Sequence, residues 1–324
     1  MISKIITKDE LKKQININDF IDSSVNGSVF ACEWFVNLKN VNNFIVIEDN
    51  GEIVLIMPLF EDSSNCNALN QSTMYIPYGG PVIKSLPRQQ RNKIRYLRRL
   101  NTQLIKTLKE RYLKISFSTD TSITDIMPYI RAGFMPELRY TYKLDISNPD
   151  ALYNNYGHDR RKEIRKANNY NLKFVIDSSL EFVKVDRFVE WESKYGFDSS
   201  VNEVREIMEA AIKNDNGGVF VAFNGNIVVG AVGMLWRNNT AYIMYSYYDK
   251  NYDCGTIAFL YDNIFKYLSK EKNVKVMYFE GSVYESVEDW NISFNAYQDR
   301  FYNLHYDERG NEEIARTMYV YFEK

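Results

Sequence analysis

Basic side chains are concentrated between residues 158 and 166, where five Arg and Lys residues follow a histidine. In a helix, His158, Arg161 and Arg165 lie near one stripe. Cations in the first turn of a helix oppose its dipole, at roughly 0.3–1 kcal/mol each. We therefore interpret the segment as a candidate surface for a phosphate, diphosphate or carboxylate. The alternative is a solvated charged face, partly neutralised by the two acidic residues of the segment.

Gly255 and Thr256 stand between a predicted strand and a predicted helix. A glycine just before a helix exposes backbone N–H groups at the positive end of the helix dipole, where anions bind. This position is therefore a second candidate anion site, and an ordinary loop is the alternative.

Glu280 follows a run of β-forming residues and precedes Gly281 and Ser282. A carboxylate at a strand end, beside a flexible glycine and a hydroxyl, could act as a general base for an amine. The alternative is an acidic residue at the start of the next helix. In the first half of the chain, the segment 78–81 (Tyr-Gly-Gly-Pro) could bring backbone close to a ligand, or is a bare turn.

Two Asn-Gly pairs, Asn50-Gly51 and Asn224-Gly225, each separate two runs of β-forming residues. Asn-Gly between such runs predicts a hairpin with a tight type I′ turn, in which both turn residues have positive φ. The pairs lie about half the chain apart, and the order of predicted elements repeats around them. We expect a duplicated fold of the mixed α/β (α+β) class, with two tandem domains, 1–147 and 148–324, and a cleft between them.

Hydrophobic spacing places the elements that must position these residues. Helices are expected at about 18–39, 94–108, 150–168, 180–213, 257–268 and 287–297. Hairpins are expected at 44–60 and 219–236, and further strands at 113–117, 139–146, 241–248, 274–279 and 318–322.

Composition narrows the function classes. The chain has 324 residues, is 45% hydrophobic and 25% charged, and carries a formal net charge of -2, so it is not a typical nucleic-acid binder. With two histidines and three dispersed cysteines, no Cys/His spacing indicates a zinc site. The odd cysteine count, the absence of a signal peptide and the lack of an apolar run of about 18 residues predict a soluble cytoplasmic protein without membrane insertion.

Taken together, these motifs resemble the Fem-type (FemAB-like) branch of the GNAT N-acyltransferases, whose members contain two GNAT-like domains. The segment 161–167 matches the pattern R-x-x-I-[RK]-[KR]-A, and 279–282 (Phe-Glu-Gly-Ser) follows in the same order as in the family. The resemblance implies transfer of an acyl or aminoacyl group to an amine, by direct attack and without a metal or a covalent enzyme intermediate. It implies acyl-CoA or aminoacyl-tRNA as the donor. The acceptors it implies are peptidoglycan precursors or sugars of surface polymers.

The resemblance also assigns roles to residues of this chain. Arg161, Arg165 and Lys166 match the basic helix, which would hold a phosphate of donor or acceptor, and Gly255 and Thr256 match the helix start where GNAT proteins bind the donor pyrophosphate. For the transfer itself we expect Glu280 or Tyr248 to relay the proton, and Tyr78, Gly79 and Ser282 to contact substrate. The chain lacks the Q/R-x-x-G-x-G/A signature of CoA-binding domains, which argues against acetyl-CoA. It also lacks a long coiled-coil insertion, which argues against tRNA. A non-catalytic ligand-binding protein and an RNA-binding module are the rival interpretations.

Overall fold

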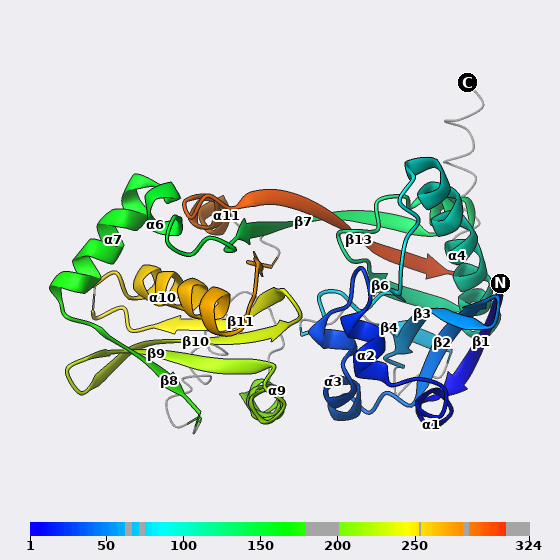
Figure 1. Ribbon diagram of the computed structural model, residues 1–324, viewed down its shortest axis with the longest axis horizontal. Helices are drawn as coiled ribbons and strands as arrows, with labels where there is room; N and C mark the ends of the chain where they lie inside the picture. Colours follow the sequence, from blue (N-terminus) through cyan, green and yellow to red (C-terminus); the bar gives the residue numbers. More distant parts are fainter. Residues whose placement is uncertain are drawn as a thin grey trace. The chain divides into compact units, whose positions relative to one another are not determined.

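The structure is a computed structural model that describes residues 1–61, 67–70, 75–178, 180, 201–252, 254–280 and 285–308 (Figure 1). The chain forms two compact units: unit 1 is Met1–Arg139 with Arg300–Lys324, and unit 2 is Tyr140–Asp299. The chain passes from unit 1 to unit 2 within β7 (Met135–Asp145) and returns within β13 (Tyr297–Asp307). The sequence predicted a single division, into 1–147 and 148–324, whereas the chain passes between these units twice, and the described residues 300–308 belong with unit 1.

Unit 1 contains an antiparallel sheet and a second group of strands. The sheet has the order β1-β2-β3-β5, formed by Ile2–Thr7, Asn43–Asp49, Glu52–Leu59 and Val82–Ile83. In the second group, β6 (Lys114–Ser118) pairs in parallel with β4 (Ala68–Asn70) and antiparallel with β13. Unit 1 therefore has mixed strand pairing.

The helices of unit 1 begin and end where local signals place them. Thr7 and Glu10 form a capping box at the start of α1 (Lys8–Lys12), and the Asn16 side chain caps α2 (Ile17–Asp22). The remaining helical elements are η1 (Val29–Ala31), α3 (Glu33–Leu38), α4 (Gln90–Arg111) and α5 (Met127–Arg131). The buried face of α4 consists largely of Leu97, Leu100, Leu104 and Leu108, each worth roughly 1.5–3 kcal/mol on burial.

Unit 2 contains a mixed sheet in which β7, β12, β11, β10, β9 and β8 follow one another. Their bounds beyond β7 are Lys173–Asp177 (β8), Gly217–Asn224 (β9), Ile227–Arg237 (β10), Thr240–Tyr248 (β11) and Val276–Tyr278 (β12). Only the β11–β12 pair is parallel among the pairings described in this unit.

Helices cover both faces of this sheet. The helices are α6 (Leu152–Asn155), α7 (His158–Asn169), α9 (Val201–Lys213), α10 (Thr256–Glu271) and α11 (Glu285–Ile292). Phe220 and Ala222 of β9 belong to the core cluster that includes α10, whereas a Cβ at Gly217 would meet Ala211 of α9. Because side chains alternate along a strand, α10 and α9 lie on opposite faces (Figure 1).

Both predicted hairpins are present, but only one has the expected turn. In the β2–β3 hairpin, Asp49 pairs with Glu52, and Asn50 and Gly51 have φ of 52° and 84°. In the β9–β10 hairpin, Asn224 is still in the strand and pairs with Ile227. The prediction of an Asn224-Gly225 turn was therefore wrong by one residue: the turn is Gly225-Asn226, with Gly225 at φ 61°.

Two predicted helices are interrupted. The expected 18–39 helix ends at Asp22, where the Ser23 and Ser24 hydroxyls bond the last carbonyls and Gly27 packs against the Ile21 carbonyl. The expected 150–168 helix is divided into α6 and α7 by an extended Tyr156-Gly157.

The elements predicted from residue 180 onwards also differ in part from the structure or lie outside the described residues. The expected 287–297 helix ends at Ile292, and Tyr297 begins β13. The predicted strand at 318–322 and most of the helix predicted at 180–213 lie outside the described residues, although α9 occupies the end of that helix.

Candidate functional site

The start of α10 is built around Gly255. Gly255 is left-handed, with φ 71° and ψ 28°, a conformation that favours glycine. A Cβ at this position would also lie 2.2 Å from the backbone oxygen of Glu163 on α7. The glycine therefore allows two things at once: the turn into α10 and the close approach of α7.

The first turn of α10 offers backbone donors rather than a side chain. The N-cap residue is a glycine, so among the described residues the cap provides no side-chain hydrogen bond to the first N–H groups of the helix. The Thr256 side chain is buried: its Oγ1 lies 3.1 Å from Cys254 Sγ, and its methyl group would be 2.5 Å from a Cβ at Gly230. Gly255 has no side chain and the Thr256 side chain is buried, so only the backbone N–H groups of this segment could reach a ligand.

The basic residues of α7 have different surroundings. Arg160 is drawn inwards: Nη1 lies 2.6 Å from Glu163 Oε2, and the guanidinium lies 3.8 Å from the centre of the Trp290 ring. Arg161 donates from Nη1 to the Asn154 carbonyl at 3.0 Å. Arg160 and Arg161 are therefore partly engaged in holding α7 in place.

Two predicted cations of α7 remain at the surface. Arg165 is exposed and Lys166 is half-buried. Lys166 follows Glu163 by three residues, which places it on the same face of α7, one turn later. The Glu163 backbone packs against Gly255, so this part of α7 lies against the start of α10. The structure thus brings two of the predicted anion-binding segments together.

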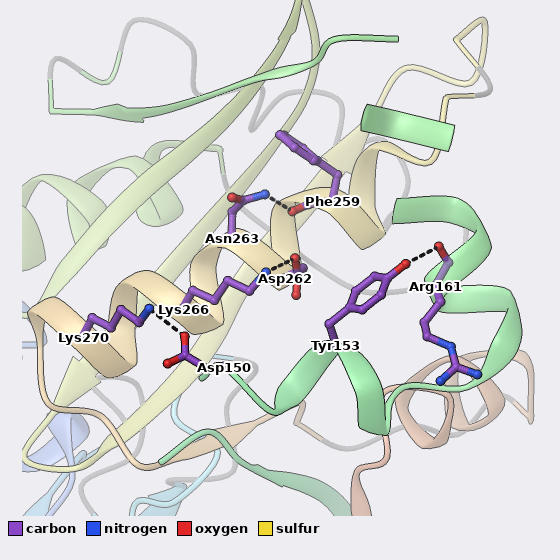
Figure 2. A network of polar contacts seen from close by, with 8 residues as sticks. All are labelled: Asp150, Tyr153, Arg161, Phe259, Asp262, Asn263, Lys266 and Lys270. Atoms are coloured by element: carbon purple, nitrogen blue, oxygen red, sulfur yellow. Dashed lines mark hydrogen bonds and ion pairs between the residues drawn. The ribbon is translucent and has the colours of Figure 1, made fainter. Parts of the chain in front are cut away.

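Polar contacts join α6 to α7 and join α10 to the segment just before α6 (Figure 2). Tyr153 Oη donates to the Arg161 carbonyl at 3.4 Å, and Lys270 Nζ lies 2.9 Å from Asp150 Oδ1. Asp262 of α10 is buried and accepts from Lys266 Nζ at 2.7 Å. Burial, together with Asp262, raises the pKa of the Tyr156 hydroxyl, which is therefore protonated at neutral pH.

Strands β11 and β12 separate next to α10. Their parallel pairing runs only from Thr240 with Val276 to Tyr242 with Tyr278. Beyond that point β11 continues to Tyr248, while β12 ends and leads into Phe279 and Glu280. Beyond Tyr242, the described part of β11 is therefore no longer paired with β12.

Among the described carboxyl groups, that of Glu280 has the largest rise in pKa. Its Oε1 oxygen is buried and has no hydrogen-bond partner among the described residues. Burial raises the pKa of this carboxyl to about 8. Its φ of 62° is unusual for a residue with a side chain. A carboxyl that exchanges its proton near neutral pH suits general acid–base chemistry, and such groups occur often at functional sites.

Sequence reasoning missed a buried lysine beside this strand. Lys143 of β7 lies opposite Tyr278 in the β7–β12 register, with its Nζ 2.7 Å from Asp299 Oδ2 and 4.5 Å from the centre of the Tyr278 ring. Burial opposes the charge, but Tyr278 and Asp299 outweigh it and raise the pKa of Lys143. A single Lys within an alternating strand was the only signal in the sequence.

The other predicted residues are more dispersed. Tyr248 ends β11 opposite Gly230 and is exposed, so it could reach a bound molecule. Ser282 lies outside the described residues. Tyr78 is buried in unit 1 between the rings of Phe30 and Phe301.

The neighbouring glycines of unit 1 are packed in the same way. Gly79 is buried, and a Cβ at Gly80 would lie 2.8 Å from the Ser118 carbonyl oxygen. This packing gives Tyr78 and Gly79 a structural role, and direct contact with substrate stays a prediction.

The described residues contain neither a cluster of metal-binding side chains nor a membrane-spanning helix. No group of three or more His, Cys, Asp and Glu side chains in them could hold a metal ion. None of the helices in these ranges combines the length and apolar composition required to span a membrane.

Comparison with known proteins identifies the fold. No family model matches the sequence, and no curated protein matches it. Among solved structures, FemX is similar with a TM-score of 0.66 and 13% identity, over 93% of this chain and 97% of that one. L-PGS from Bacillus licheniformis is similar with a TM-score of 0.56 and 11% identity, over 95% and 94%.

A tandem GNAT protein from the clavulanic acid biosynthesis pathway is similar with a TM-score of 0.51 and 9% identity, over 94% of this chain and 98% of that one. These structures agree with the mixed α/β architecture and confirm the fold expected from the sequence. The chain has a Fem-like fold of the tandem GNAT type.

Proposed function

We propose that this chain is an N-acyltransferase of the cytoplasm, which transfers an acyl or aminoacyl group to an amine of a cell-envelope or surface-polysaccharide precursor. The observation that carries the proposal is Glu280: a buried carboxyl with a pKa of about 8, placed directly after β12 where β11 and β12 separate. The similarity of the fold to FemX and to tandem GNAT proteins supports the class of reaction.

The donor is assigned to the junction of α7 and α10. Uncapped N–H groups of the first turn of α10 bind a phosphate of acyl-CoA or of aminoacyl-tRNA, aided by the helix dipole. Lys166 and Arg165 add positive charge from α7, and Arg161 adds charge at its first turn. Both donors carry phosphates, so the same arrangement serves either.

The reaction is a direct displacement at the donor carbonyl. The acceptor nitrogen forms a bond to the carbonyl carbon and gives up a proton to the Glu280 carboxylate. Backbone N–H groups of β11, beyond its pairing with β12, stabilise the oxyanion. The C–S bond of a thioester or the C–O bond of an aminoacyl ester then breaks, and Tyr248 or water delivers a proton to the leaving group.

The decisive experiment is an assay with defined donors and acceptors. Acetyl-CoA, longer acyl-CoAs and alanyl-tRNA are each combined with glucosamine or a UDP-linked muropeptide, and products are identified by mass spectrometry. We expect Glu280→Gln to reduce transfer at least about 100-fold. The matched control is Glu285→Gln at the exposed start of α11, which should retain activity.

A second experiment isolates donor binding. Calorimetric titration with the acyl-CoAs should show binding that Arg165→Glu and Lys166→Glu weaken, whereas Lys162→Glu, an exposed residue of the same helix, has a smaller effect. Binding without transfer for every donor and acceptor would reject the enzyme.

One observation favours a non-catalytic ligand-binding protein as the second candidate. The start of α10 has a single glycine, and its Cα side is covered by the Glu163 backbone. A donor therefore meets fewer exposed N–H groups than a glycine-rich loop would give. If the chain is a non-catalytic binding protein, the titration with acyl-CoA gives heat and the transfer assay gives no product.

A further inference from the structure

The outer face of α4 in unit 1 carries a row of exposed cations with one threonine among them. At helical spacing along this face lie seven exposed residues, all but one of them basic, flanked by the exposed Asn92 and Glu110: Arg91, Arg95, Arg98, Arg99, Thr102, Lys106 and Lys109. We call this set the α4 ridge. A helix of 22 residues is about 33 Å long, so the ridge extends over a distance comparable with the diameter of a small domain.

The ridge reflects a strong segregation of charge along the sequence. Nine Lys and Arg residues and no Asp or Glu occur from Ser63 to Lys109, although the whole chain carries -2. The rest of the chain therefore carries -11. A weakly acidic protein that concentrates its positive charge in this way has an oriented electric field, and that field favours one face for contact with a polyanion.

Neighbouring carboxylates neutralise only part of the ridge. Arg98 Nε lies 2.9 Å from Asp125 Oδ2, Arg99 is 3.9 Å from Asp49, and Lys106 is 3.8 Å from Glu110. Arg91 and Arg95 have no ion-pair partner among the described residues. Even the paired Arg98 and Arg99 side chains stay 48% and 62% exposed, so several of their N–H groups remain available.

A depression of about 400 Å³ lies in the middle of the ridge. It is lined by Met1, Arg98, Arg99, Thr102 and Gln103. Two guanidinium groups, a hydroxyl and an amide around one hollow provide donors for a phosphate, and Arg is suited to bidentate contact with phosphate oxygens.

The surroundings of the ridge favour lipid over nucleic acid. Single-stranded nucleic acids are usually bound on exposed aromatic rings. In the described part of unit 1, the exposed large apolar side chains are all aliphatic or Met: Ile2, Val25, Met127, Met135 and Leu138. Met127 is close to the ridge, because its backbone N–H bonds to Asp125, the partner of Arg98. Cations beside an aliphatic side chain suit the headgroup region of a bilayer.

We propose that the α4 ridge docks unit 1 on the surface of an anionic phospholipid membrane, with one lipid phosphate in the depression beside Arg98 and Arg99. The contact is peripheral, because the leucines of α4 are committed to the core of unit 1. The membrane contact uses residues that the proposed transfer reaction does not, so each proposal can be tested independently of the other.

The test is flotation of the full chain with vesicles. We expect binding to phosphatidylcholine vesicles that contain phosphatidylglycerol, little binding to phosphatidylcholine alone, and a decrease with added salt. Each cation near an anionic surface adds to the free energy of binding to the membrane. The double variant Arg91→Glu with Arg95→Glu should therefore weaken vesicle binding at least about 30-fold. Both side chains are exposed, so the melting temperature should stay the same.

A matched control separates the ridge from net charge. Lys173→Glu with Lys213→Glu makes the same change in total charge on exposed residues of unit 2. We expect this variant to bind vesicles like the parent. Equal weakening by both double variants, or no binding of the parent to anionic vesicles, would overturn the proposal. A mobility shift with tRNA, abolished by the ridge variant in a chain that ignores vesicles, would assign the ridge to nucleic acid instead.

Discussion

Helices α4 and α10 each follow a hairpin and its next strand, and each has an apolar face on the core, yet the two use charge in opposite ways. On α4 the cations face solvent along the whole helix. Around α10 several charged groups are enclosed: Asp262 is buried in the helix itself, Arg160 lies against Trp290, and the Oε1 oxygen of Glu280 is buried after β12. Exposed charge suits long-range attraction, whereas burial raises the pKa of the Glu280 carboxyl, which favours proton transfer.

The largest expected effect tests whether α10 depends on close packing. Gly255→Ala places a Cβ 2.2 Å from the Glu163 oxygen and adds the strain of a positive φ. We expect the free energy of unfolding to fall by roughly 3 kcal/mol or more, measured by urea denaturation.

The control for this substitution is Gly51→Ala in the β2–β3 turn. Gly51 also has a positive φ, of 84°, but a Cβ there meets nothing within 4 Å. Only the backbone strain remains, at about 1–2 kcal/mol. Equal losses for the two variants would show that the α7–α10 contact contributes nothing.

The next effect concerns the pH dependence of stability. Burial raises the pKa of the Glu280 carboxyl from its ordinary 4.5 to about 8, so the folded chain holds a proton that the unfolded chain releases in this range. Stability is full below about pH 4.5 and falls as pH rises towards 8, at up to about 1.4 kcal/mol per pH unit. Denaturation curves of the parent and Glu280→Gln at several pH values should show this slope only in the parent.

The exposed cations of α4 provide the contrast. Arg91→Gln and Arg95→Gln should leave the pH dependence of unfolding unchanged, because these groups are solvated in both states. A slope that persists in Glu280→Gln would mean that another group binds the proton.

The smallest effect compares an enclosed arginine with an exposed one. Arg160→Lys keeps the charge but loses the flat guanidinium over Trp290 and its bond to Glu163, so we expect a loss of about 1 kcal/mol and a change in tryptophan fluorescence. Arg95→Lys on the ridge should change stability by less than about 0.5 kcal/mol. Similar values for both would remove the distinction between the two regions.

Local patterns predicted much of the fold. The leucine spacing of α4 and the Asn50-Gly51 turn depend on neighbours in the sequence, and both were confirmed. Strands β1 and β13 were missed: near its start β13 has the polar residues Gln298, Asp299 and Arg300, and its pairing with β6 joins residues about 185 positions apart. The polar start hides the strand in the sequence, and its partner strand lies too far along the chain to reveal it.

The sequence by itself determined that residues 158–166 are basic, that a glycine precedes α10, and that Glu280 follows a strand. Tertiary structure decided what these groups can do. It enclosed Arg160 against Trp290, placed Gly255 on the Glu163 backbone, buried the Glu280 carboxyl, and paired Lys143 with Asp299. The physical reason is that residue type sets the charge a side chain can carry, while desolvation and partners from distant segments set its pKa and its reach.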